Sequence, residues 1–184
     1  MIDQWPWIVV AVGILGLLGL YLSSTAGRLD RLHHRIDTAR VSLDSQLLRR
    51  SAVTAQVASS GLLDPASSLV LSEAAIDART VDPDDDDARG LVESEFSRVL
   101  CVAFPDREQV AELRTDPDTG ELVDELAATT RRVEMSRRFL NDAVSSARLL
   151  RRQRMVRLFH LAGHTPWPAN FEMDDTPPPG FSDR

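Results

Sequence analysis

The sequence predicts an all-α membrane protein with a single N-terminal transmembrane helix, followed by an antiparallel helical bundle of two long and two short helices. Three observations predict this fold class. Residues 7–22 form an uncharged apolar run. Two long segments, 26–60 and 122–161, repeat mostly apolar residues in steps of three and four, which is the spacing of a helix packed against another helix. Clusters of proline, glycine and aspartate separate two shorter helical segments between them.

The first element is the run "WIVVAVGILGLLGLYL", residues 7–22, which predicts a transmembrane helix. With Trp5 and Pro6 it reaches about the 18 residues that suggest a membrane span. Asp3 is the only charged side chain before the run, whereas four arginines follow it closely. These are Arg28, Arg31, Arg35 and Arg40. The positive-inside rule therefore predicts an extracytoplasmic N-terminus, residues 1–6, and a cytoplasmic C-terminal side.

A cleaved signal peptide is the alternative for this segment, because "SSTAG" at residues 23–27 offers small residues to a peptidase. Such a peptide needs a positive region ahead of its apolar run. Here the basic residues follow the run, so a retained span is favoured. We therefore predict one membrane span at residues 7–22 and a helical bundle at residues 23–162.

Turn signals divide the soluble part into helices. The stretch "SSGLLDP" ends the first long helix at Gly61, and Asp64 and Pro65 supply an N-cap and a proline at the first position of the next helix. That helix should end before "VDPDDDDARG", which predicts a loop. A third helix ends at Pro105, and "DPDTG" precedes the last long helix. Residues 163–184 are proline-rich and acidic without a helical period, which predicts a mostly disordered tail.

The composition limits the classes of function. The formal net charge of −7 argues against a general nucleic-acid binder, because such binding needs a net basic surface. All 21 basic residues are arginine, so arginine enrichment alone says little about phosphate binding. The single cysteine, Cys101, lies in the apolar run "VLCVAF" and excludes an internal disulfide. We expect it to be a buried, unreactive thiol.

Two blocks resemble the LemA family of bacterial membrane-anchored helical proteins. They are "ARVSLDSQLLRR" at residues 39–50 and "RVEMSRRFLNDAV" at residues 132–144, and "NFE" at 170–172 is similar to the family's closing element. Leu140 stands where a tyrosine is usual, and "SAVTAQV" replaces a Pro-Asn-Leu-Val step, which is typical of a divergent, actinobacterial branch. The resemblance implies an antiparallel helical bundle beyond one span, and it does not supply a reaction, because the family has no agreed catalytic activity.

An antiparallel alignment of the two long helices would place these blocks opposite one another. Arg40 with Asp44 and Arg138 with Asp142 have the i,i+4 spacing for pairing along a helix. Other polar side chains of the blocks could reach across the seam and specify its register. The predicted interhelical polar cluster contains Arg40, Asp44, Gln46, Arg50, Arg137, Arg138, Asn141 and Asp142. A small-ligand site and a partner-docking site are the alternatives for this cluster.

The sequence predicts no catalytic, cofactor-binding or metal-binding residue. It contains neither a G-x-S-x-G element nor a P-loop nor a G-x-G-x-x-G loop. The acidic run at residues 82–87 lacks the glycine and terminal glutamate of a calcium-binding loop, so a solvated loop that caps the next helix is favoured over a metal site. His160 and His164 are four residues apart, but Gly163 interrupts the turn between them.

Arginines gather without an intervening acid near the end of the last long helix, and this helix is expected to return toward the bilayer. Basic segments near an anionic leaflet gain favourable surface attraction. The predicted anionic-membrane contact contains Arg28, Arg31, Arg35, Arg148, Arg151, Arg152, Arg154 and Arg157. The alternative is that these side chains pair with the acidic loop and tail.

Taken together, these features predict a non-enzymatic, single-span protein of the LemA type that acts as a scaffold or docking module on the cytoplasmic face. Its expected partners are the membrane and either another protein or a second copy of itself, without nucleic acid, cofactor or small-molecule substrate. The alternatives are an envelope- or lipid-associated protein that binds anionic membrane through its arginines, and an unrecognised hydrolase.

Overall fold

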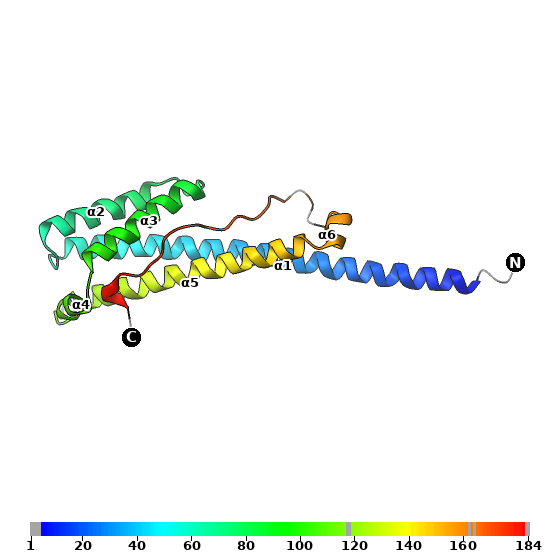
Figure 1. Ribbon diagram of the computed structural model, residues 1–184, viewed down its shortest axis with the longest axis horizontal. Coiled ribbons are helices and arrows are strands. Elements are labelled where there is room, and N and C mark those ends of the chain that lie inside the picture. The colour runs from blue at the N-terminus through cyan, green and yellow to red at the C-terminus, as the bar shows by residue number, and fades with distance from the viewer. Residues whose placement is uncertain (1–4, 117–118, 162, 164, 183–184) are drawn as a thin grey trace. The chain divides into compact units, whose positions relative to one another are not determined.

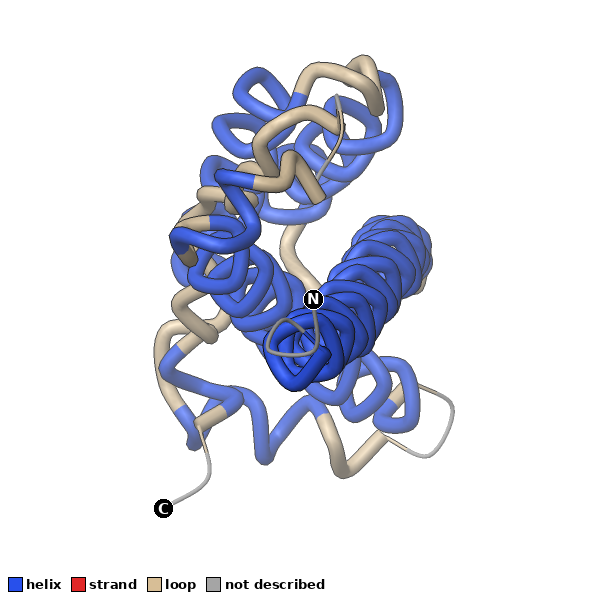
Figure 2. The backbone as a smooth tube through the Cα atoms, turned by 90° about the vertical axis from the view of Figure 1, so that its right-hand side faces the viewer, coloured by secondary structure: helices blue, strands red, loops and turns tan. Residues whose placement is uncertain are grey.

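The computed structural model describes residues 5–116, 119–161, 163 and 165–182. They form six α-helices and one 3-10 helix, and no strand occurs among these residues (Figure 1, Figure 2). The elements are α1 (Trp5–Ser59), α2 (Pro65–Thr80), α3 (Asp86–Ala103), α4 (Arg107–Leu113), α5 (Gly120–Arg151), α6 (Arg154–Leu158) and η1 (Pro179–Phe181). The predicted all-α fold class is therefore confirmed.

The chain divides into two compact units. Unit 1 contains Met1–Thr38 and Asp142–Ala169, and unit 2 contains Ala39–Asn141 and Asn170–Arg184. The single bundle that the sequence predicts over residues 23–162 stays a prediction. The helices α2, α3 and α4 all belong to unit 2 and supply half of the buried residues in its hydrophobic core.

In unit 1, the apolar run lies in α1 and leads into the following residues without a break. The sequence predicts a separate span and soluble helix. No proline interrupts the joint, and the hydroxyls of Ser24 and Thr25 donate to the carbonyl of Tyr21 at 2.9 and 2.8 Å, as they can within a continuous helix. Apolar side chains of the run are widely exposed, with Trp7 at 75% and Leu17 at 70%. By length and composition, α1 can cross a membrane near the N-terminus.

Aspartates begin three of the helices of unit 2. Asp64 Oδ1 accepts hydrogen bonds from the backbone N–H groups of Ala66 and Ser67 at 3.0 and 3.1 Å, and Pro65 is the first residue of α2, as the sequence predicts. Asp85 caps α3 and Asp106 caps α4 in the same way. These caps satisfy backbone donors that have no partner within their helices.

The core of unit 2 combines apolar side chains from five helices and η1. Figure 1 shows α2 and α3 side by side as a helical hairpin. The buried core includes Val57 of α1, Leu71 of α2, Leu100 of α3, Val110 of α4 and Leu126 of α5, each with no exposed surface. The shared burial joins segments that are far apart in the sequence.

The C-terminal segment, residues 170–182, is part of unit 2 and is anchored by buried aromatic rings. Phe171 is 2% and Phe181 is 3% exposed. The ring of Phe181 lies 4.8 Å from that of Phe104, and the N–H of Gly180 donates to the carbonyl of Phe104 at 3.1 Å. A Cβ on Gly180 would lie 2.6 Å from Val110, so glycine is required for this close approach. The prediction of a mostly disordered tail is therefore wrong for this segment.

Replacing the buried ring of Phe181 tests the role of the C-terminal segment in unit 2. We expect Phe181→Ala to lower the free energy of unfolding by about 3–5 kcal/mol, because it removes a buried aromatic side chain and leaves a cavity. Phe139→Ala is the matched control, since its ring is 61% exposed, and should change stability by about 0.5 kcal/mol or less. Chemical denaturation of the full chain in detergent, followed by helical circular dichroism, measures both; equal effects would contradict the anchoring role.

Candidate functional site

A row of ion pairs joins α1 to α3 within unit 2. Arg40 Nη1 lies 2.7 Å from Asp86 Oδ1, and Arg89 Nη1 lies 2.7 Å from Asp44 Oδ1. Arg50 pairs with Glu93 farther along the same helices. The sign of the charge alternates along both helices. A shift of α3 by one helical turn would bring like charges together, so the row favours one register.

Arg50 and Glu93 form the most deeply buried of these pairs, each with a side chain that is 1% exposed. Arg50 Nη2 lies 2.5 Å from Glu93 Oε2, and Nη1 donates to Ser97 Oγ at 3.1 Å. The guanidinium carbon lies 4.8 Å from the ring centre of Phe96, which is also buried. A pair taken out of water in this way contributes little net stability, but it strongly disfavours arrangements that leave either charge alone.

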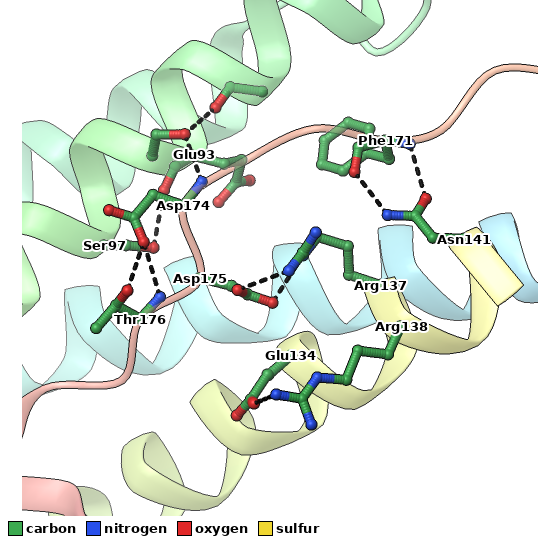
Figure 3. A network of polar contacts seen from close by, with 12 residues as sticks. Glu93, Ser97, Glu134, Arg137, Arg138, Asn141, Phe171, Asp174, Asp175 and Thr176 are labelled. Carbon is green, nitrogen blue, oxygen red and sulfur yellow. Dashed lines mark hydrogen bonds and ion pairs between the residues drawn. The ribbon is translucent and has the colours of Figure 1, made fainter.

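The polar residues of α5 contact the C-terminal segment of unit 2 (Figure 3). Arg137 donates two hydrogen bonds to Asp175, from Nε at 2.7 Å and from Nη2 at 2.8 Å. The side-chain amide of Asn141 donates to the carbonyl of Phe171 at 3.2 Å and accepts from its N–H at 3.0 Å. The hydrogen bonds with Asp175 raise the pKa of Arg137. An arginine fork and an amide fork thus hold the segment on α5.

This arrangement corrects the predicted pairing of the two family-like blocks. Arg40 and Asp44 each form an ion pair with a residue of α3. Arg138 pairs with Glu134, one turn before it, and not with Asp142, which is exposed. Arg40 thus has a carboxylate on a neighbouring helix, whereas Arg138 uses the i,i+4 spacing with the carboxylate that precedes it in α5.

The predicted interhelical cluster is divided between two surfaces. Arg40, Asp44 and Arg50 contact α3, while Arg137 and Asn141 contact the C-terminal segment. Gln46 is partly buried, and its Oε1 atom has no hydrogen-bond partner among the described residues. The first family-like block therefore contacts α3, and the second contacts the C-terminal segment.

The C-terminal segment also lies against the outer face of α3. The N–H of Asp174 donates to Ser94 Oγ at 2.9 Å, and Cys101 Sγ lies 3.6 Å from the carbonyl of Thr176. A Cβ on Gly90 would lie 2.2 Å from the carbonyl oxygen of residue 172, so only glycine permits this contact. Cys101 is partly buried. Burial, reinforced by the Asp174 carboxylate, raises the pKa of the Cys101 thiol.

The arginines predicted to touch the membrane fall into two groups in unit 1. Arg148 Nε donates to the carbonyl of Pro168 at 2.8 Å, and Arg151 Nη1 donates to that of Pro166 at 2.6 Å. The Arg151 guanidinium also lies 5.0 Å from the ring centre of Trp167. The remaining six are exposed: Arg28, Arg31, Arg35, Arg152, Arg154 and Arg157. Arg148 and Arg151 are thus engaged by the chain itself, and six guanidinium groups face solvent.

Two adjoining clefts of about 430 and 500 Å³ follow the α2–α3 hairpin. Both are lined by Val70, Glu95 and Val99, so we call them together the hairpin groove. Glu73 and Asp77 add acidic groups to the first cleft, whereas the second is largely apolar. Such a groove can take an apolar helix face with basic residues beside it.

The sequence analysis did not identify the partner residues on α3 and in the C-terminal segment, because no motif marks them. Asp86, Arg89 and Glu93 are spaced by three and four residues, so a charged stripe was visible in the sequence. Asp175 carried no such signal, because it lies in a segment without a helical period. Among the described residues, no three His, Cys, Asp or Glu side chains gather as a metal ion would require. The described surface therefore includes a partly apolar groove with carboxylates and a set of exposed guanidinium groups.

The contribution of the buried ion pair to stability can be tested by replacing Arg50 alone and by replacing Arg50 and Glu93 together. Arg50→Met alone should lower the free energy of unfolding by about 3–5 kcal/mol, because it leaves Glu93 charged and buried. Arg50→Met with Glu93→Leu should restore most of that loss. Arg49→Met is the control, since its pair with Glu125 is half-exposed and is expected to contribute about 1 kcal/mol or less. A double variant no more stable than Arg50→Met would argue against the pair.

The rate at which Cys101 is alkylated should report release of the C-terminal segment. Arg137→Ala removes two charge-assisted hydrogen bonds and should speed alkylation by about tenfold or more, whereas Arg138→Ala should leave the rate unchanged. The docked segment favours the neutral thiol, so docking should weaken as the pH rises through the raised pKa of Cys101. Iodoacetamide labelling across pH 7 to about 10 checks both points when each rate is divided by that of the unfolded chain at the same pH, because the thiolate is the reacting form. Equal rates in the two variants would contradict the contact.

Comparison of the chain with protein-family models, with characterised proteins and with solved structures gives no match. A functional interpretation therefore depends on the residues and contacts described above.

Proposed function

We propose that this chain is a non-enzymatic, single-span membrane protein of the LemA type that docks a partner helix at the cytoplasmic face of a bacterial inner membrane. The apolar start of α1 supports the span, and the arginines that follow it support an orientation with the N-terminus outside. The two family-like blocks and the closing "NFE" support the LemA assignment.

The proposal includes an antiparallel packing of α1 and α5. Within unit 1, Leu29 of α1 shares a buried cluster with Leu150 near the end of α5. Within unit 2, Arg49 Nε of α1 donates to Glu125 Oε1 near the start of α5 at 3.0 Å. Later residues of α1 thus meet earlier residues of α5, which is the order that antiparallel helices require.

The hairpin groove is the observation that carries the docking role. Val102 lines it and is 82% exposed, and Val70 is 49% exposed, so their apolar surface faces solvent. The acidic side chains of Glu73 and Asp77 lie in the same groove. This chemistry fits an amphipathic helix that places an apolar face against the valines and basic residues beside the carboxylates.

A lipid-associated role is the second candidate, and it is favoured by the six exposed arginines of unit 1. The hydrolase alternative would need histidine and aspartate side chains that converge in one cleft. The described lining of the hairpin groove contains no histidine.

A charge placed in the hairpin groove should weaken docking. We expect Val102→Glu to reduce the affinity of the full chain for a basic amphipathic helical peptide by about tenfold, because the anchor contact is lost. Leu91→Glu is the matched control, since Leu91 lies on the same helix, is 73% exposed and does not line the groove. Fluorescence anisotropy with the protein in phosphatidylcholine nanodiscs measures the affinity without anionic lipid.

The same variants give a test in native membranes. A photo-crosslinking amino acid in place of Glu95, which lines both clefts, should yield an adduct with another protein. That adduct should persist with Leu91→Glu and disappear with Val102→Glu. Recovery of uncrosslinked monomer alone, or of an adduct made only of two copies of this chain, would contradict docking of a partner helix.

A further inference from the structure

A second cleft, of about 500 Å³, lies in unit 1 between α1 and the end of α5. Arg28, Arg31 and Arg35 line it from α1, and Leu149 and Gln153 line it from α5 and the residues that follow. The three arginines are spaced by three and four residues, so they share one face of α1. We call this feature the arginine cleft.

The described lining of the arginine cleft contains no acidic side chain. Asp30 lies on the same helix, but its carboxylate is 3.9 Å from His34 Nε2, and that pair is widely exposed. Three cations that share a cleft repel one another unless an anion lies between them. Guanidinium groups bind phosphate oxygens through paired hydrogen bonds, so a phosphate is the anion that this cleft fits best.

The position of the cleft along α1 places it near the headgroup layer if the apolar run crosses a membrane. Arg28 follows Leu22 by six residues, a rise of about 9 Å along the helix. The headgroup layer is about 5–8 Å thick on each side of the hydrocarbon core. Helical side chains tilt toward the N-terminus, and Arg31 Nη1 lies 3.6 Å from the position of a Cβ on Gly27, one turn closer to the run. The guanidinium groups of Arg28 and Arg31 can therefore reach the headgroups, whereas Arg35, which begins about 20 Å beyond Leu22, lines the side of the cleft that is farther from the run.

The apolar part of the cleft distinguishes a lipid from a free phosphate ion. Leu32, Leu149 and Leu150 line the same space as the arginines, and Leu149 is 70% exposed. A phosphate ion has no apolar group that could pack on that surface, whereas the glycerol and upper acyl chain of a lipid can cover it. Arg148 and Arg151 do not compete for the ligand, because carbonyls of the chain already engage them.

We infer that the arginine cleft, formed by Arg28, Arg31 and Arg35 with Leu149 and Gln153, binds the phosphate headgroup of an anionic lipid. The inference rests on the proposed membrane span, but it does not depend on docking at the hairpin groove. It assigns a defined site to three of the arginines and leaves Arg152, Arg154 and Arg157 to general surface attraction.

The test uses the full chain in nanodiscs made of phosphatidylcholine with a minority of phosphatidylglycerol. After release into detergent, native mass spectrometry counts the lipids retained by the protein. The triple variant R28Q/R31Q/R35Q should lose preferential retention of phosphatidylglycerol by about tenfold or more. The matched control is R79Q/R107Q/R132Q, which changes the charge equally at exposed arginines of unit 2. Glutamine and arginine have similar helix propensities, so both variants should fold.

Three outcomes would overturn the inference. They are equal retention by the two triple variants, equal retention of phosphatidylglycerol and phosphatidylcholine by the unaltered chain, and displacement of the lipid by inorganic phosphate at millimolar concentration. The last would mean a site for free phosphate. Alkaline carbonate extraction from cell membranes tests the span independently, and the Val102→Glu assay tests docking, so failure of the proposed function is distinguishable from failure of the lipid site.

Discussion

The buried ion pair between Arg50 and Glu93 is the constraint on which the arrangement of unit 2 depends. Neither charge reaches solvent, so each must keep the other as a partner. The more exposed pairs that Arg40 and Asp44 make with α3 alternate in sign along the same helices and point to the same register. Because these pairs fix the register of α3 on α1, they also fix the direction in which the other faces of α3 point. One of them lines the hairpin groove, and another receives the C-terminal segment.

The C-terminal segment depends on small features of the helices beneath it. Gly90 leaves room for the backbone at residue 172, and Ser94 accepts a hydrogen bond from Asp174. From α5, Arg137 and Asn141 hold the segment through forked hydrogen bonds. Because several of its backbone groups are hydrogen-bonded and two phenylalanines are buried, this extended segment packs against the helices without regular secondary structure. The block that resembles a family signature in α5 thus serves contacts with this segment.

Arginine has several physical roles in this chain, and composition alone could not separate them. Arg50 is buried and paired, Arg148 and Arg151 donate to backbone carbonyls, and Arg28, Arg31 and Arg35 line a cleft without acids. The first role specifies packing and the second fixes a local loop. The third leaves charge available to a ligand. Exposure and partner chemistry therefore separate arginines with a structural role from those that can bind an anion.

The sequence by itself determined the helical class, the long apolar start of α1 and the beginning of α2 at Asp64 and Pro65. These properties arise from periodicity, caps and turn residues, which act within a few residues of one another. It also located Arg50 and Arg137 as polar residues beside a packed seam. Only the tertiary structure decided their partners, Glu93 and Asp175, since these are 43 and 38 residues away. The order of the C-terminal segment likewise depends on tertiary packing, because Phe104 and Val110 must be in place before they can contact Phe181 and Gly180.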